Sequence, residues 1–515
     1  MAYYQLGICQ PKNLRRRPSL IKLHTDILIC SLPVSSLNFA PAAPALLKSC
    51  VEKAGFTAKT ADLSQVFYIE ISNKNFNLYD HDSSYLLPRH SRHVDSESKV
   101  KDWLDLCIKE IKQVNPKFIG LSVFTYYMIR SAYLLCVEIR KHCPNIKIIL
   151  GGYGLTQSAN NLKNIPGIKN IDLIKTFDVF CTEQNLSDYN IIGEGEEALV
   201  KILEGSDLEQ KNNDAVVLYN VPISNFDNYN LHDYCYATDD ITLPVTGSKG
   251  CVRQCTFCDI PQKFGKFRYR SGKHIADEII FLKEKYGVKS FTFTDSLING
   301  SMKALIELTT NLAQYNDTCS INDRIRWSAQ YISRPIGQTP EYVYELMARS
   351  GAEGLTIGLE SGSNNVLKAM NKKVKIEDVD YELEIFEKYG ISTTLLFIIG
   401  FYNETYDDFL DTIRTIVRYQ KYVASGTVLK MDLGIPLTIT PETALYYDAH
   451  NLEINLNDAD PVQWTANNNP SLTLIERIRR RIIAQIVCDQ LGIPTGMSGY
   501  NIKRIAGLLE NESTF

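Results

Sequence analysis

The sequence predicts an α/β protein in which two series of alternating strands and helices follow one another along the chain. Short apolar runs rich in β-branched residues predict the strands, and longer segments with apolar residues every three to four positions predict the helices. At 515 residues the chain is also too long for one ordinary hydrophobic core. We therefore expect two or three domains.

The first series runs from about residue 25 to residue 204. Its expected strands are Asp26–Leu32, Thr57–Ala61, Phe118–Phe124, Ile146–Leu150 and Tyr189–Ile192, and its main expected helices are Pro44–Ala54, Lys99–Val114 and Tyr127–His142. This order favours a doubly wound parallel sheet of the Rossmann-like or flavodoxin-like kind. In such sheets ligands bind beyond the C-terminal ends of the strands.

The second series predicts strands that are joined by helical crossovers. The strands are Ile241–Val245, Ser290–Thr294, Ile325–Gln330, Leu355–Leu359, Ser392–Ile399 and Val428–Leu433, and the helices are His274–Tyr286, Met302–Tyr315, Pro340–Arg349, Ile376–Tyr389 and Thr405–Gln420. Such a series favours a parallel sheet wrapped by helices. In parallel barrels the chemistry takes place at the C-terminal strand ends.

A cysteine triplet follows the first strand of this second series. Cys251, Cys255 and Cys258 have the spacing C-x3-C-x2-C. Three thiolates so close together can hold three irons of a four-iron, four-sulfur cluster and leave the fourth iron open to another ligand. A closed zinc site needs four ligands, usually as two short pairs, and the sequence has no second C-x2-C or H-x3-H pair. Three unrelated core cysteines do not fit this polar, glycine-containing loop.

Phe257 lies between the last two cysteines, and with it the loop resembles the signature C-x3-C-x-aromatic-C of the radical S-adenosylmethionine (SAM) superfamily. The resemblance implies a partial (β/α)6 barrel and a free iron that is chelated by SAM. It also implies reductive cleavage of SAM to a 5′-deoxyadenosyl radical, with an electron donor such as flavodoxin or ferredoxin. The cofactors bring the hard chemistry, and the protein brings placement and shielding.

Three strand ends carry the other residues that the resemblance assigns to SAM. Asp295 and Ser296 end the second strand, where related enzymes hold the SAM amine; the alternative is an Asx turn or a helix cap. Glu360 and Ser361 end the fourth strand in a segment similar to G-x-E-S-G.

The fifth strand ends with Ile399 and Gly400, whose backbone would pack on adenine. Tyr402 and Asn403 replace the Pro and Gly of the family's G-x-P-G-E-T turn, so the turn departs from the family pattern there. Asn403 or Thr405 could also simply cap the next helix.

The first series resembles the cobalamin-binding domain that precedes the barrel in one large radical SAM subgroup. The matching pieces are Pro41–Pro44, Gly120–Thr125, Gly151–Gly152 and Gly193–Glu196. The resemblance implies a cobalamin site that uses Ser122, Thr125, Gly151 and Gly152, although glycines after strands are more often simple turns. Because the loop after Leu32 lacks the histidine of D-x-H-x-x-G, any cobalamin would bind without a histidine lower ligand.

Composition bounds the partners and the location. Of the thirteen cysteines, the ten outside the triplet are expected to be reduced and structural. No apolar stretch is long enough to span a membrane and the first residues lack the apolar core of a signal peptide, so we expect a cytoplasmic protein. The net charge of −4 does not indicate nucleic acid. The basic loop Lys249–Lys273 could balance the negative charge of the cluster or attract an anionic substrate; the alternative is an ordinary solvated loop. The run Arg477–Arg481 is expected to be solvated.

The sequence thus predicts an N-terminal arm (1–24), a cobalamin-binding-type domain (25–215), a radical SAM barrel (216–440) and a helical extension (441–515). The leading function is cobalamin-dependent methylation of an unactivated carbon. Cobalamin-independent rearrangement, oxidation or ring formation is one alternative, and a catalytically inactive iron-sulfur binding module is another. Residues 63–98 and the tail are expected to cover or shape the substrate cavity.

Overall fold

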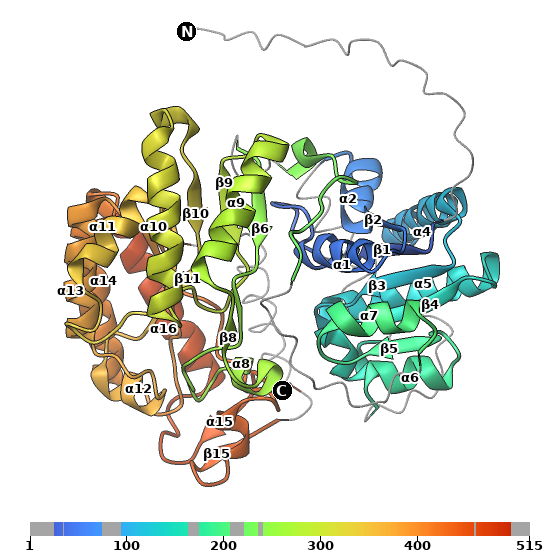
Figure 1. Cartoon of the computed structure of the whole chain (residues 1–515). Helices are drawn as coiled ribbons and strands as arrows, with labels where there is room; N and C mark the ends of the chain where they lie inside the picture. Colours follow the sequence, from blue (N-terminus) through green and yellow to red (C-terminus); the bar gives the residue numbers. More distant parts are fainter. Residues whose placement is uncertain are drawn as a thin grey trace, which may run out of the picture.

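A computed structural model describes residues 25–33, 35–74, 94–162, 175–206, 221–234, 240–457 and 460–495. The predicted N-terminal arm lies outside these ranges. Figure 1 shows two α/β units side by side, with the last described residues folded onto the second unit. No helix within the described ranges is long and apolar enough to cross a membrane.

The first unit, called the N-terminal domain below, is built on a five-stranded parallel sheet with the order β2-β1-β3-β4-β5. The strands are β1 (Ile27–Ser31), β2 (Ala58–Asp62), β3 (Phe118–Ser122), β4 (Lys147–Gly151) and β5 (Tyr189–Ile191). This is the flavodoxin-like order, and it confirms the doubly wound sheet expected from the sequence. The strand order reverses between β1 and β3, so the ligand crevice of this fold lies beyond their C-terminal ends.

Helices cover both faces of this sheet. The helices are α1 (Ala42–Lys53), α2 (Leu63–Val66), α4 (Val94–Val114), α5 (Ile129–His142), α6 (Phe177–Glu183) and α7 (Gly195–Leu203). One core contains Trp103 of α4 and Leu135 of α5, and the opposite core contains Val51 of α1 and Leu199 of α7. Burial on both faces explains why β1 is a continuous apolar run.

The second unit contains two parallel sheets that together form a partial barrel. Its strands are β6 (Thr242–Val245), β9 (Ser290–Phe293), β10 (Arg326–Ser328), β11 (Gln330–Tyr331), β12 (Leu355–Glu360), β13 (Thr393–Phe397) and β14 (Val428–Asp432). The sheet orders are β10-β9-β6 and β11-β12-β13-β14. One predicted strand, Ile325–Gln330, is split into β10 and β11. Its first half pairs with β9 and its second half with β12, which joins the two sheets into one arc.

Five long helices cover the outside of this arc. They are α9 (Gly272–Tyr286), α10 (Met302–Thr318), α11 (Glu341–Arg349), α13 (Ile376–Tyr389) and α14 (Tyr406–Ala424). The outward-facing strand side chains Leu243, Phe291 and Trp327 lie in the core beneath them. These crossovers agree with the (β/α)6 arrangement predicted from the sequence.

The inner face of the arc is polar where β6, β9 and β10 meet. Because side chains alternate along a strand, the residues between the core positions point inward. The Thr242 hydroxyl donates to Ser290 over 3.0 Å, Ser328 to Thr292 over 3.2 Å, and the hydroxyls of Thr246 and Thr294 are 2.7 Å apart. Hydroxyl groups rather than apolar side chains therefore line this part of the barrel.

The C-terminal extension returns to the barrel. It contains α15 (Ala444–Tyr447), a small antiparallel pair β15 (Ile454–Asn455) and β16 (Thr465–Ala466), and α16 (Leu474–Gln490). α16 agrees with the helical extension predicted for this part of the chain, whereas the β pair was not predicted. α16 packs on α14, and the Met431 amide of β14 donates to the carbonyl of Pro494. The extension thus covers the open side of β14.

The prediction that the run Arg477–Arg481 is solvated is wrong for three of its arginines. Arg477, Arg480 and Arg481 are 0%, 3% and 2% exposed, whereas the Arg479 side chain is 73% exposed. Arg480 pairs with the Glu404 carboxylate after β13 and with Glu476 on its own helix, and Arg481 donates to the Gly434 carbonyl after β14. Arg477 donates to the carbonyls of Leu437, Val462 and Trp464. Glu404, Gly434 and Leu437 lie 76, 47 and 40 positions away from the arginines that contact them, so the local charge pattern could not reveal these contacts.

Candidate active site

The three cysteines lie in one loop after β6, at the C-terminal end of the barrel. A short antiparallel pair, β7 (Ser248–Lys249) and β8 (Arg268–Tyr269), closes the base of this cluster loop. Cys255 is buried and the other two cysteines are half-buried. Burial raises the pKa of the Cys258 thiol to about 11. A thiolate in this loop therefore needs a nearby positive charge, which an iron cluster supplies when it binds.

The described part of the chain has no three His, Cys, Asp or Glu side chains that converge on a single metal ion. The three sulfurs of a cluster site bind three different irons, so they do not need a common centre. The donor set fits a cluster with one open iron.

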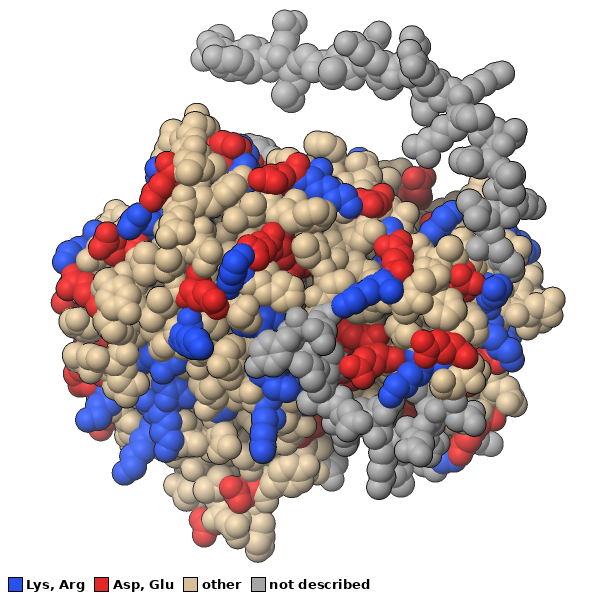
Figure 2. All heavy atoms as spheres, in the orientation of Figure 1, with Lys and Arg blue, Asp and Glu red and all other residues tan. Residues whose placement is uncertain are grey.

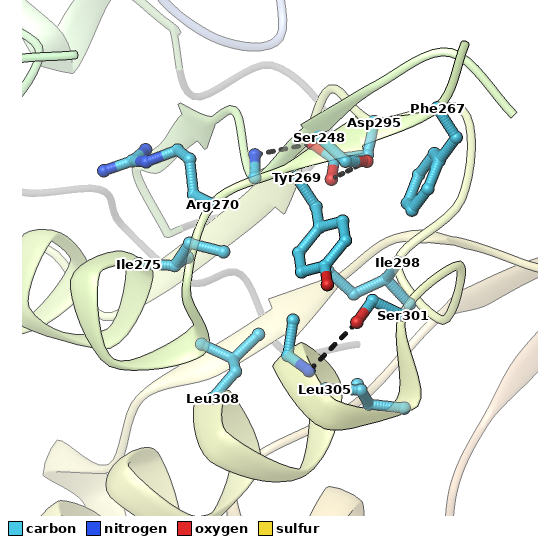
Figure 3. Close-up of a pocket in the computed structure, with 12 residues that line it drawn as sticks. Ser248, Phe267, Tyr269, Arg270, Ile275, Asp295, Ile298, Ser301, Leu305 and Leu308 are labelled. Atoms are coloured by element: carbon cyan, nitrogen blue, oxygen red, sulfur yellow. Dashed lines mark hydrogen bonds between the residues drawn. The ribbon is translucent and has the colours of Figure 1, made fainter. Parts of the chain in front are cut away.

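Asp295 holds the base of the cluster loop. One of its carboxylate oxygens accepts from the Gly247 amide over 2.7 Å and the other accepts from the Ser248 hydroxyl over 2.6 Å. Figure 3 shows Asp295 and Ser248 beside a small cavity that is also lined by Ile275 and Leu305 of the outer helices. Burial raises the pKa of Asp295 to about 6. The carboxylate predicted to meet the SAM amine is therefore already bonded to the cluster loop, and neighbouring Ser296 is half-buried.

Arg270 secures the other end of the cluster loop. Its guanidinium donates to the carbonyl of Thr246 over 2.8 Å and forms a buried ion pair with Glu278 of α9. The Arg270 amide also donates to the carbonyl of Gly247. Together with Asp295, this arginine fixes where the loop leaves and rejoins the barrel.

Glu360 lies at a β-bulge near the end of β12 and is buried. Its φ of +72° is unusual for a residue other than glycine and marks local backbone strain. The Glu360 carboxylate pairs with Lys372 Nζ over 2.7 Å. Burial lowers the pKa of Lys372, but the charges of Glu360 and Cys255 outweigh it and raise the pKa overall.

Lys372 also links this pair to the signature aromatic residue. Its Nζ lies 5.9 Å from the centroid of the Phe257 ring, which meets Phe401 edge-on at 6.4 Å. Glu360, Lys372, Phe257 and the turn after β13 thus come together beside Cys255. Sequence reasoning missed Lys372, because a lysine in the run Asn371–Lys375 looks like an ordinary solvated charge.

Ser361 lies apart from this group. Its hydroxyl is fully buried, 3.3 Å from the hydroxyl of Thr412 on α14, and accepts from the Ser363 amide over 3.1 Å. The predicted pair Glu360–Ser361 is therefore divided between two faces of the strand end.

The turn after β13 is held by the C-terminal extension. Gly400 has a φ of +83°, and a Cβ there would lie 2.5 Å from Arg477 Cγ, so only glycine fits. The amide of Gly400 donates to the Glu404 carboxylate over 3.1 Å, and Arg480 donates to the same carboxylate over 3.1 Å. These contacts form a defined turn without the usual Pro and Gly. Both Ile399 and Gly400 are buried at this edge.

Of the two caps that the sequence allowed for α14, Thr405 is the one that forms. Its hydroxyl accepts from the Asp408 amide, and the Asp408 side chain accepts from the Thr405 amide. This capping box fixes the start of the helix directly after the turn.

The C-terminal edge of the N-terminal domain has the features of a ligand crevice. The Oγ1 of Thr125 and the Oγ of Ser35 are buried and have no hydrogen-bond partner among the described residues. They follow β3 and β1, the two strands at the switch point, and Ser122 ends β3 half-buried. Gly151 ends β4, and a Cβ on Gly152, whose φ is +113°, would lie 2.7 Å from the carbonyl oxygen of Val123.

Large apolar side chains are exposed at the same edge. Phe124 and Ile192, which follow β3 and β5, are 60% and 41% exposed. A crevice with two unpartnered hydroxyls, close backbone and open apolar side chains fits a large cofactor with polar and apolar parts, such as cobalamin.

The two units meet through opposite charges. Lys249 of the cluster loop pairs with Glu196 over 2.5 Å and with Glu194 over 3.5 Å, and Arg268 also pairs with Glu194. Lys263 Nζ lies 3.6 Å from the centroid of the Tyr153 ring, which follows Gly152. Part of the basic loop therefore docks the N-terminal domain, a role that neither sequence interpretation included. The cluster loop therefore lies against the segments that follow β4 and β5.

Comparison with known proteins agrees with this arrangement. Residues 245–416 match the radical SAM superfamily. The chain is 33% identical over 180 residues to bacteriochlorophyllide d C-12(1)-methyltransferase of Chlorobaculum tepidum, a match that covers 34% of this chain and only 37% of that protein. It is 25% identical over 364 residues to an uncharacterized methyltransferase of Pyrococcus horikoshii, covering 68% of this chain and 73% of the relative.

Two solved structures share the fold over most of both chains. The radical SAM methyltransferase TsrM from Kitasatospora setae superposes with a TM-score of 0.61 at 15% identity, covering 89% of each chain. The cobalamin-dependent SAM radical enzyme OxsB superposes with a TM-score of 0.62 at 14% identity, covering 95% of this chain and 71% of that one. With the cysteine loop and the partial barrel, the family match identifies residues 245–416 as a radical SAM domain, and members of that superfamily use a four-iron, four-sulfur cluster and SAM.

Proposed function

We propose that the protein is a radical SAM enzyme that methylates an unactivated carbon and uses cobalamin for the methyl transfer. The observation that carries the proposal is the contact between the cluster loop and the C-terminal edge of the N-terminal domain, through Lys249, Glu194 and Glu196. Through this contact the loop that carries the signature cysteines lies against the domain that carries the proposed cobalamin site. The methyltransferases among the similar proteins favour the same reaction.

The chain's own residues would divide the work by position. Cys251, Cys255 and Cys258 would hold the cluster, and Asp295 would position their loop. Glu360 and Lys372 present a buried negative and a half-buried positive charge beside Cys255, which suits the amino and carboxylate groups of SAM. When bound, the cluster and SAM supply a 5′-deoxyadenosyl radical, and cobalamin supplies methyl-transfer chemistry.

The N-terminal domain would hold cobalamin without a histidine ligand. Thr125 and Ser35 offer free hydroxyls, and Gly151 and Gly152 let backbone approach the cofactor closely. The substrate would lie between the two units, above the hydroxyl-lined inner face of β6 and β9. An external one-electron donor such as flavodoxin or ferredoxin would reduce the cluster.

The test is anaerobic reconstitution with iron and sulfide, followed by incubation with dithionite and SAM. We expect 5′-deoxyadenosine to form, and replacement of the three signature cysteines by alanine to abolish it. The matched control is Cys319→Ala, a half-buried cysteine outside the loop, which should leave the rate unchanged. Reconstituted protein that forms no 5′-deoxyadenosine would instead be an iron-sulfur binding module.

Cobalamin is tested separately by the optical spectrum of protein purified from cobalamin-supplemented cells. We expect bound cobalamin in the wild type and its loss in Gly152→Val, because that side chain would collide with the Val123 backbone. The variant should keep its iron-sulfur absorbance. A cobalamin-free wild type that still forms 5′-deoxyadenosine would favour the cobalamin-independent reactions.

A further inference from the structure

An exposed basic surface lies beside the cluster loop, on the segment that follows β12. Lys368 lies in the short helix α12 (Asn364–Ala369), and Lys373 and Lys375 follow it. All three are exposed, and none forms an ion pair with any residue that the structure describes. Figure 2 shows Lys and Arg side chains gathered over this part of the molecule, where Figure 1 places α12. We call these three residues the lysine surface.

The segment that carries the lysine surface is hydrogen-bonded directly to the cluster loop around Cys255. The amide of Thr256 donates to the carbonyl of Met370 over 3.0 Å, and Asn371 Nδ2 donates to the carbonyl of Gln254 over 2.8 Å. The guanidinium of Arg253 reaches the carbonyl of Lys373 over 3.3 Å. The lysines thus stand where the cysteine backbone comes nearest to the segment after α12.

The cluster loop is also open to solvent on this side. Val252 is 45% exposed, and Gln254 is exposed between Cys251 and Cys255. The opposite side of the loop is occupied, because Lys249 and Arg268 contact the N-terminal domain. In Figure 1 α12 and the N-terminal domain lie on opposite sides of α8 (Ile260–Phe264). A macromolecule can therefore approach the cluster loop beside α12, away from its contact with the N-terminal domain.

We propose that the lysine surface docks the small acidic protein that donates electrons to the cluster. The inference rests on the proposed function, since only a reducible cluster needs such a partner. One electron passes from the reduced carrier to the oxidised cluster, so the carrier is oxidised by one electron and the cluster is reduced by one. Opposite charge steers such encounters and aligns the partner over the cluster.

Nucleic acid suits this surface less well. The chain has a net charge of −4 and a pI of about 6.1, whereas nucleic-acid-binding domains are usually strongly basic. Two acids follow these lysines: Glu377 accepts from Asn364 over 3.2 Å, and Asp378 accepts from the backbone amides of Ile336 and Lys375. Neither forms an ion pair with a side chain of the lysine surface. Three exposed lysines make a compact footprint that matches a small carrier rather than the length of a nucleic acid.

The test compares two reductants on the reconstituted full-length protein. The variant Lys368→Glu, Lys373→Glu, Lys375→Glu reverses the lysine surface. The matched control, Lys101→Glu, Lys109→Glu, Lys112→Glu, makes the same charge change at exposed lysines on α4 of the N-terminal domain. The measured quantity is the rate of 5′-deoxyadenosine formation with reduced flavodoxin at increasing concentration, and separately with dithionite.

We expect reversal of the lysine surface to raise the half-saturating flavodoxin concentration at least tenfold and to leave the dithionite-driven rate within twofold of the wild type. The control variant should change neither. An unchanged flavodoxin dependence, or an equal loss with both reductants, would overturn the docking assignment. Loss of tRNA retention on a filter with unchanged flavodoxin dependence would assign the surface to nucleic acid instead. If the wild type forms no 5′-deoxyadenosine with either reductant, the proposed function itself fails.

Discussion

Replacement of Arg480 by alanine should destabilise the edge of the barrel that is expected to hold SAM. The Arg480 side chain is 3% exposed and donates to the Glu404 carboxylate over 3.1 Å and to the Glu404 and Thr405 carbonyls over 3.0 and 3.1 Å. Glu404 is fully buried, so the variant leaves its carboxylate with the Gly400 amide as its remaining hydrogen-bond donor. The Thr405 carbonyl loses its bond from Arg480 in the same change, whereas the Glu404 carbonyl keeps the Nδ2 of Asn469 as a donor over 3.0 Å.

The expected loss follows from these contacts. Removal of one partner of a buried ion pair typically costs about 3–5 kcal/mol, because the other charge stays buried without compensation. Burial raises the pKa of Glu404 to about 7, while Arg480 opposes that rise. Without Arg480 the carboxylate becomes easier to protonate, so protonation relieves part of the loss at low pH. We therefore expect a loss of about 4 kcal/mol at pH 8 and a clearly smaller loss at pH 6.

The assay is equilibrium unfolding in urea at both pH values, together with the dissociation constant of SAM for the reconstituted protein. Arg479→Ala is the control, because that side chain is exposed on the same helix, and it should change stability by less than about 0.5 kcal/mol. The double variant Arg480→Met, Glu404→Gln removes both charges and should recover at least half of the loss. A loss of less than about 1 kcal/mol for Arg480→Ala at pH 8, or a double variant no more stable than the single one, would contradict a stabilising role of this buried ion pair.

Three further outcomes are expected. Gly272→Ala should destabilise the protein by about 3 kcal/mol in urea unfolding, because its Cβ would lie 2.1 Å from the Ala304 carbonyl between α9 and α10; a loss below about 1 kcal/mol would contradict that close contact. Burial raises the pKa of Glu382 to about 7, so the protonated carboxyl favours the folded state and this contribution is lost as pH rises through 7. The free energy of unfolding should therefore be about 1 kcal/mol lower at pH 8 than at pH 6 because of this group, and Glu382→Gln should lack this difference. Lys249→Glu should reduce methylated product about tenfold while 5′-deoxyadenosine still forms, and adding Glu196→Lys should restore at least half, a recovery that a simple folding defect would not show.

The sequence was sufficient for most of the fold because each strand and helix carries its own periodic pattern. α13, from Ile376 to Tyr389, has the predicted bounds, and its closing Gly390 adopts the left-handed conformation that ends helices. The split of Ile325–Gln330 into β10 and β11 was not predictable in the same way. It results from pairing with two different neighbours, and a single strand's pattern carries no information about its partners.

The candidate site was predicted where spacing along the chain determines it. The cysteine loop, which follows β6, could be recognised in the sequence because its three ligands lie within eight residues. Lys372 and Arg480 were missed because their partners come from other elements, and in sequence a lysine or arginine run looks solvated. Asp295 was located correctly at a strand end, but the direction of its side chain depends on Gly247 and Ser248, which are close to it only in the folded chain.

The contacts of α16 with the turn after β13 also have a consequence for the order in which the chain folds during synthesis. Arg480 and its carbonyl partner at Glu404 are 76 positions apart in the chain, so a ribosome releases the turn well before it releases the helix that holds it. During that interval the barrel strands can pair, but the turn that is predicted to pack on the adenine of SAM still lacks the arginine that holds it. Cluster insertion and SAM loading should therefore be post-translational events, and a nascent chain stalled before α16 should be open to proteolysis at residues 400–405.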